Sequence, residues 1–217
     1  MMDLKQALKM AVAGSVLAGA SIAASGQAVQ QIAFRSHTPQ DYSDILSGRY
    51  KDLGIDISGQ LVVPPGSEKV PAVVIVPGSS GVQSWMQSLV AKRLNDAGIA
   101  TLIIDSFTPR GVGQTATDQS TVPMAASVID GFAALKALSQ RGDIDARRIG
   151  ITGFSRGGTV ALFTQHKAFQ EALGLGDLQF AAHLPFYPAC STTVEFPQPT
   201  SAPSLILMGE KDDYTPA

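Results

Sequence analysis

The chain has 217 residues, which is enough for one domain with a sizeable core. Its 45% hydrophobic and 16% charged residues are ordinary for a globular enzyme. A net charge of −2 without any basic run excludes the electrostatic footprint of a nucleic-acid-binding protein, so we expect no nucleic-acid partner.

Residues 1–28 have the composition of an export signal. Lys5 and Lys9 give the segment a positive start, and residues 10–24 are small or apolar without any charge. The stretch is rich in Ala, Gly and Ser and is shorter than the roughly 20 residues of a membrane span, which favours a cleaved signal over a membrane anchor. We therefore expect a periplasmic or secreted domain at 29–217, with no stable membrane span.

Apolar runs alternate with amphipathic segments along the rest of the chain. The pattern predicts strands separated by helices, which together indicate a doubly wound, mostly parallel α/β sheet in one domain. Residues 31–50 are mixed and polar, and no element is predicted there. The predicted strands are 55–63, 72–76, 100–104, 149–152, 180–187 and 204–208, the helices are 84–97, 124–138 and 159–169, and a polar loop covers 105–121.

The stretch Gly153–Gly157 has the form Gly-x-Ser-x-Gly and follows a predicted strand and precedes a predicted helix. This is the context of a nucleophile elbow, in which a strained turn exposes the serine above the sheet. Ser155 is the candidate nucleophile, and the backbone N–H of Arg156 is the candidate oxyanion donor. A chance loop is the alternative, and a phosphate loop is disfavoured because no Gly-x-x-x-x-Gly-Lys-Ser/Thr is present.

The loops after two other strands offer the next parts of an acyl-transfer site. A second oxyanion donor is expected in the loop after 72–76, with Ser79 as the first choice and Ser80 as the second, although an ordinary glycine turn is the alternative. The acid is expected after 204–208, where Asp212 and Asp213 are both candidates unless they only form a turn.

The general base is the part that these residues lack. In this order of elements a histidine should follow the acid, and none does. His166 is about 16 Å along a helix from Ser155, His183 is about 13 Å before the end of its strand, and His37 precedes the core. We interpret all three as structural or surface residues, and we expect a C-terminal strand, helix and histidine loop to be missing from the sequence.

At these motifs the chain resembles the dienelactone hydrolase family of α/β-hydrolases. The resemblance covers nearly all of the mature chain and rests on five segments in order, at 77–81, 105–111, 153–157, 186–190 and 209–216. It implies the α/β-hydrolase fold and a histidine near the C-terminus. It also implies a triad acid four residues before Pro216, which selects Asp212.

The resemblance implies a serine hydrolase of small carboxylic esters or lactones that forms an acyl-enzyme, with no metal or organic cofactor. Ser155 stands where dienelactone hydrolase itself has Cys, which favours a more general ester hydrolase. Pro77 replaces a His of many relatives and should leave the backbone donors intact. The alternatives are an acyltransferase or amidase on the same fold, and a non-catalytic binding protein. Residues 1–217 alone are expected to be poorly active, because the base is absent.

The sequence also predicts a location for three further side chains, those of Arg110, Arg156 and Cys190. Arg110 and Arg156 would line the mouth of the site and bind a substrate carboxylate, or would equally be solvated surface arginines. Cys190, the single cysteine, is expected to be buried and inert. Some relatives carry a second cysteine beyond the acid motif, with which Cys190 would form a disulfide in the full chain.

Overall fold

The structure, a computed structural model, describes residues 28–66, 68–190, 198–213 and 215. The predicted export signal lies almost entirely outside these residues and stays a prediction. No helix in the described part is long and apolar enough to cross a membrane. The strands are β1 (Gln30–His37), β2 (Gly54–Val62), β3 (Val70–Val76), β4 (Ala100–Asp105), β5 (Ile144–Phe154) and β6 (Ala182–Phe186). The α-helices are α2 (Tyr42–Ser47), α3 (Lys92–Asp96), α4 (Met124–Ser139), α5 (Arg156–Phe163) and α6 (Lys167–Ala172). The 3-10 helices are η1 (Arg49–Asp52), η3 (Thr108–Arg110) and η4 (Gln119–Thr121), and η2 (Met86–Ala91) is a π-helix that leads into α3.

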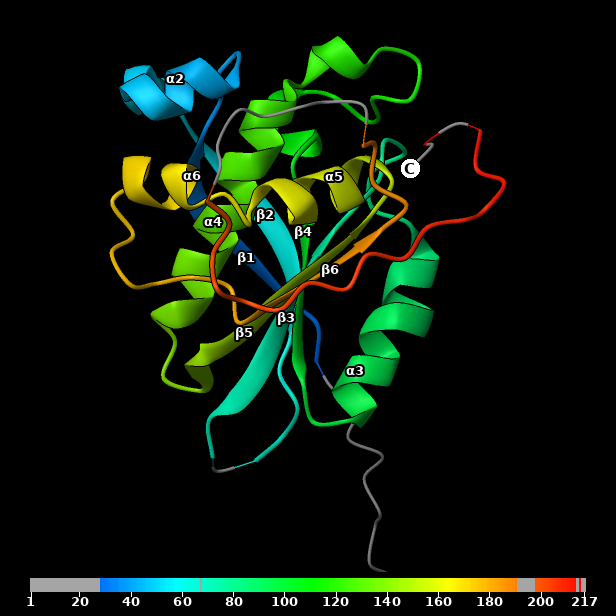
Figure 1. The fold of residues 1–217 in the computed structure, drawn as a ribbon. Coiled ribbons are helices and arrows are strands. Elements are labelled where there is room, and N and C mark those ends of the chain that lie inside the picture. Colours follow the sequence, from blue (N-terminus) through cyan, green and yellow to red (C-terminus); the bar gives the residue numbers. More distant parts are fainter. Residues whose placement is uncertain (1–27, 67, 191–197, 214, 216–217) are drawn as a thin grey trace, which may run out of the picture.

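The strands form one six-stranded sheet in the order β1-β2-β4-β3-β5-β6 (Figure 1). Strands β4, β3, β5 and β6 run parallel to one another, whereas β2 is antiparallel to both of its neighbours. Helices cover both faces, with α4 and α5 on one side and α3 on the other (Figure 1). The prediction of a doubly wound, mostly parallel α/β sheet is therefore confirmed.

The parallel strands bury both of their faces, which explains their continuous apolar sequences. Along β3, Val74 and Val76 belong to the large core under α4 and α5. Ile75, which points the opposite way, belongs to the smaller core under η2 and α3. Because side chains alternate between faces with a period of two, a strand covered on both faces has no polar position.

Several elements differ from the predicted ones, and two of them, α2 and η1, begin in the segment 31–50, where no element was predicted. Strand β1 was not predicted, yet it pairs along its whole length with β2. The helix predicted at 159–169 is broken after Phe163, because residues 165–167 instead pair with the segment 198–200: the N–H of Thr200 donates to the carbonyl of Gln165 at 2.7 Å. The strand predicted at 204–208 forms only isolated parallel bridges beside β6.

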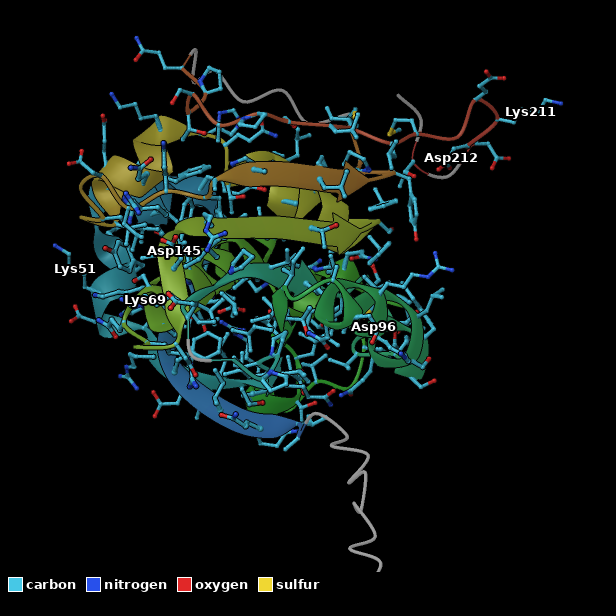
Figure 2. The ribbon with its side chains drawn as sticks, turned by 90° about the horizontal axis from the view of Figure 1, so that it is seen from below. Lys51, Lys69, Asp96, Asp145, Lys211 and Asp212 are labelled. Carbon is cyan, nitrogen blue, oxygen red and sulfur yellow. The ribbon has the colours of Figure 1, made fainter. Side chains whose placement is uncertain are left out.

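Parallel strands bring their carboxyl ends to one edge, and the loops there build the site. Lys69 and Asp145, near the starts of β3 and β5, lie on the opposite side of the molecule from Asp212 (Figure 2). Asp212 therefore lies toward the edge at which β3, β5 and β6 end, as expected for ligand-binding loops of such a sheet.

Candidate active site

Ser155 occupies the sharp turn between β5 and α5. Its backbone angles are φ 53° and ψ −117°, a conformation that costs a residue with a Cβ about 1–3 kcal/mol. The N–H of Ser155 donates to the carbonyl of Phe186 at 3.1 Å, and its own carbonyl accepts from the N–H of Thr159 at 2.9 Å. The surrounding strands and helix thus hold Ser155 in a strained turn, in the strand-turn-helix context that the sequence predicts.

The glycines beside Ser155 allow backbone segments to approach closely. A Cβ on Gly153 would lie 2.2 Å from the carbonyl oxygen of Gly157, and a Cβ on Gly158 would lie 2.3 Å from that of Phe186. Both distances are far shorter than any real carbon–oxygen contact, so neither position has room for a side chain. The Gly-x-Ser-x-Gly-Gly sequence is therefore required by the packing of the turn.

Two cavities meet at Ser155. One has a volume of about 250 Å³ and the other about 330 Å³, and Ser79 and Ser155 line both of them. The smaller cavity has an aromatic wall, in which the Phe154 ring stacks on Phe186 at 4.9 Å and meets the edge of Trp85 at 4.8 Å. The wall of the larger cavity includes Gln119, Met124, Arg156, Thr159, Ala189 and Thr215. A group attached to Ser155 can therefore extend in two directions.

The two elements that carry the predicted backbone donors meet at the Ser155 turn. Arg156 is the first residue of α5, so its N–H has no acceptor within the helix and belongs to the positive end of the helix dipole. The loop at 77–81 follows β3 and passes against the turn, because a Cβ on Gly78 would lie 3.1 Å from the carbonyl oxygen of Phe154. The elements that carry the two predicted oxyanion donors, Arg156 and Ser79, are thus in contact.

Hydrogen bonds from residues outside the loop at 77–81 also fix its backbone. The carbonyl of Ser79 accepts from the N–H of Thr115 at 2.7 Å, and the carbonyl of Ser80 accepts from the side chain of Gln83 at 2.8 Å. Ser80 is exposed and lines only the smaller cavity. This placement agrees better with a Ser80 side chain that contacts the substrate than with Ser80 as the second oxyanion donor.

Asp212 lies next to both cavities. Its carboxylate accepts from the N–H and the hydroxyl of Thr215 at 2.8 and 2.7 Å, and Thr215 lines the larger cavity. Tyr187 lines the smaller cavity, and its pKa is raised mainly by burial and further by the negative charge of Asp212. The predicted acid therefore lies in the neighbourhood of Ser155, and Thr215 of its own turn donates to both of its carboxylate oxygens.

Comparison with known proteins agrees with this geometry. The model of the dienelactone hydrolase family matches residues 57–217, which is most of the chain. The chain belongs to the dienelactone hydrolase family. A curated relative from Bradyrhizobium, assigned as a 2-oxo-3-(5-oxofuran-2-ylidene)propanoate lactonase, is 27% identical over 177 residues, which cover 75% of this chain and 69% of the relative.

Solved structures share the fold. A Klebsiella pneumoniae protein assigned as a dienelactone hydrolase aligns with a TM-score of 0.60 and 21% identity, over 86% of this chain and 76% of that chain. The esterase Est22 aligns with a TM-score of 0.54 and 21% identity, over 79% of this chain and 47% of its own. The fold of this family member is thus the α/β-hydrolase fold.

The Arg110 side chain is not at the mouth of the site. Its guanidinium forms a two-pronged ion pair with Asp130 of α4 at 2.7 and 3.0 Å, and the two side chains are 5% and 0% exposed. Its other N–H groups donate to the carbonyls of Ser106 and His37 and to the hydroxyl of Thr38. All five donors of the guanidinium are used, so none remains for a substrate carboxylate. The expectation that Arg110 binds substrate is corrected accordingly.

The Arg156 side chain is also structural. It is buried, with its guanidinium 5.7 Å from the centre of the Phe107 ring. It donates to the carbonyl of Val122 and to both the carbonyl and the side chain of Gln119. Its guanidinium therefore braces the loop before α4 instead of facing a substrate carboxylate, whereas its backbone N–H remains beside Ser155.

None of the three histidines of the sequence lines either cavity at Ser155. His37 ends β1 and packs edge-on against Tyr50. His166 caps α6 and packs between Phe163 and Phe169. His183 is buried in β6. These positions agree with the interpretation that all three histidines lie outside the site. His166 does not lie on one continuous helix with Ser155, as the sequence predicted, because α5 ends at Phe163.

His183 predicts a pH dependence of stability. Its Nδ1–H donates to the carbonyl of Ala161 at 3.1 Å, while Nε2 is buried without a hydrogen-bond partner among the described residues. Burial lowers the pKa of His183 to about 4. Between pH 6.5 and 4 the unfolded chain therefore binds a proton that the folded chain does not, so stability falls as the pH falls, by on the order of 3 kcal/mol.

We expect His183→Asn to remove most of this slope, because the amide can still donate to Ala161 but does not titrate. Urea unfolding between pH 4 and 7 of the wild type and the variant measures the difference. Parallel curves for the two proteins over this range would contradict a neutral buried imidazole.

Cys190 and Gln119 differ from the sequence predictions, the first in its exposure and the second in its place at the site. Cys190 was expected to be buried, but it is exposed and unpaired within the described residues. Gln119 was not predicted as a site residue, because a glutamine in a polar loop carries no motif, yet it lines the larger cavity. In the described part of the chain, no group of three His, Cys, Asp or Glu side chains could hold a metal ion.

Proposed function

We propose that this protein is a serine hydrolase that cleaves small carboxylic esters or lactones through an acyl-enzyme on Ser155. The observation that carries the proposal is the placement of Ser155, which is held with a φ of 53° at the junction of two cavities and at the N-terminus of α5. Membership of the dienelactone hydrolase family and the likeness to a protein assigned as a lactonase support the substrate class.

In the proposed reaction, the Oγ of Ser155 attacks the substrate carbonyl carbon while a general base takes the hydroxyl proton. The negative charge that develops on the carbonyl oxygen is stabilised by the backbone N–H groups of Arg156 and Ser79. The base then passes its proton to the leaving alkoxide, and the acyl group remains on Ser155. Water activated by the same base releases the acid and restores the serine.

We further propose that the base is a histidine outside residues 1–217 and that Asp212 orients it. The support for this step is twofold. Asp212 lies beside both cavities, and the histidines at 37, 166 and 183 are held in other parts of the fold.

The cavities favour small substrates. Their volumes of about 250 and 330 Å³ lie just below and at the lower end of the range for ligand pockets, which is roughly 300–1,000 Å³. Because Ser155 lies between them, one cavity would hold the acyl group and the other the leaving alcohol. In a lactone both groups belong to one ring, which opens during acylation. No metal or organic cofactor takes part in the proposed reaction.

A fluorophosphonate probe tests the assignment of Ser155 directly. We expect the full-length protein to react in a 1:1 ratio, as the Ser155 oxygen displaces fluoride from phosphorus, and the modified peptide to map to residue 155 by mass spectrometry. Heat-unfolded protein should not react, because a serine hydroxyl without its base and oxyanion donors is a weak nucleophile. Labelling of a different serine, or equal labelling of unfolded protein, would contradict the proposal.

A further inference from the structure

The side chains of Gln119 and Arg156 form a chain of hydrogen bonds that ends on Ser79. The Nε2 of Gln119 donates to the Oγ of Ser79 at 2.7 Å. On its other side, the Oε1 of Gln119 accepts from the Nη1 of Arg156 at 2.9 Å. Gln119 thus connects the residue after the nucleophile to the loop that carries the second predicted oxyanion donor.

Chemistry fixes the orientation of the Gln119 amide. An arginine side chain can only donate, so the atom of Gln119 that faces Arg156 must be the oxygen. The guanidinium itself cannot shift, because it also donates to the carbonyl of Val122 and, at 3.3 Å, to the hydroxyl of Ser127. The hydroxyl of Thr115, at 3.4 Å from Oε1, can donate to the same oxygen. The amide nitrogen is therefore the atom that faces Ser79.

This orientation determines the role of the Ser79 hydroxyl. A hydroxyl has one hydrogen, and toward Gln119 the oxygen of Ser79 is an acceptor. Within the described residues Ser79 Oγ donates no hydrogen bond, so its hydrogen is available to another acceptor. Ser79 and Ser155 are the two residues that line both cavities, so Ser79 borders the same space into which a carbonyl attacked by Ser155 would enter.

We propose that the Ser79 hydroxyl donates a hydrogen bond to the substrate carbonyl oxygen and that Gln119 holds it in this donor role. The proposal rests on the hydrolase function proposed above and adds a side-chain donor to the two backbone N–H groups. Ser79 is then a catalytic residue through its hydroxyl, and Gln119 is a positioning residue. The bond strengthens as charge develops on the oxygen, so its loss should lower kcat more than it changes KM.

Two substitutions in the full-length protein test the two roles. Ser79→Ala removes the hydroxyl but keeps the backbone N–H, and we expect kcat to fall about 10- to 100-fold with KM within about twofold. Gln119→Glu presents a carboxylate that still accepts from Arg156. Because a carboxylate only accepts, it also takes the hydrogen of Ser79, which then turns away from the cavity. We expect a similar fall in kcat.

The combination of measurements separates this role from a merely structural one. Gln119→Glu gains an ion pair with Arg156, so its melting temperature should stay the same or rise while kcat falls. The double variant should be no slower than Ser79→Ala alone, because both changes remove the same hydrogen bond. Gln114→Glu is the matched control: Gln114 is exposed in the same loop and uses its oxygen to accept from the N–H groups of Ala116 and Thr117, so its turnover should be unchanged.

Failure of this proposal differs from failure of the proposed function. Wild-type kcat in Ser79→Ala or Gln119→Glu, with Ser155 still labelled by fluorophosphonate, would overturn the role of the Ser79 hydroxyl alone. Additive losses in the double variant would also overturn it. Absence of labelling at Ser155 in the wild type would overturn the proposed function, and this proposal with it.

Discussion

Ser155→Ala is expected to lower ester hydrolysis by the full-length protein by roughly 10⁴-fold or more, because it removes the hydroxyl on which the proposed acyl-enzyme forms. Turnover of a nitrophenyl ester panel by wild type and variant measures the loss. The fold should not suffer, since alanine carries the same Cβ in the same turn.

Two matched changes support the interpretation of that result. Ser139→Ala alters a serine of α4 whose hydroxyl donates to the carbonyl of Lys136, remote from both cavities, and its turnover should equal that of the wild type. Ser155→Gly should be as inactive as the alanine variant but more stable by about 1 kcal/mol, because glycine adopts a φ of 53° without strain. Substantial turnover in Ser155→Ala would mean that another residue is the nucleophile.

Gly157→Ala is expected to destabilise the protein by more than about 4 kcal/mol or to prevent folding. A Cβ at this position would lie 2.1 Å from the carbonyl oxygen of Val76 and 2.6 Å from that of Pro77. Both atoms belong to the backbone at the end of β3, which is paired on both sides in the centre of the sheet. No side chain can rotate to relieve the clash, so the helix, the strand or the turn must shift.

Gly142→Ala provides the control for this prediction. No atom lies within 4 Å of a Cβ at Gly142, which is in the turn before β5 and does not have a positive φ. Its free energy of unfolding in urea should therefore lie within about 1 kcal/mol of the wild type. A Gly157→Ala protein that is as stable as Gly142→Ala would contradict the close packing of α5 against the end of β3.

The parts of the fold that could be predicted are those whose two faces are buried. The runs in β3, β4 and β5 are continuous because helices cover both sides of these strands. Strand β1 was missed because it lies at the sheet edge, and residues such as Gln30 and Gln31 face solvent. Residues 204–208 are apolar enough for a strand, but Leu205 is 60% exposed, so apolar sequence alone did not produce regular pairing.

The parts of the site that could be predicted are those that a short local sequence specifies, and the parts that could not depend on residues far apart in the sequence. The turn at Ser155 could be predicted because five adjacent residues specify it. The roles of Arg110 and Arg156 could not, because their partners Asp130 and Gln119 lie 20 and 37 residues away in the sequence. A guanidinium beside a motif resembles a substrate-binding group until its partners are known, and here the fold supplies those partners internally.

The aromatic wall of the smaller cavity has a spectroscopic consequence. Trp85 is the single tryptophan of the sequence, and it is 38% exposed where it meets Phe154, the residue directly before Ser155. All indole fluorescence of residues 1–217 therefore arises beside the cavity that Ser155 lines. The molecule carries its own optical reporter, which needs no added dye to sense what enters that cavity.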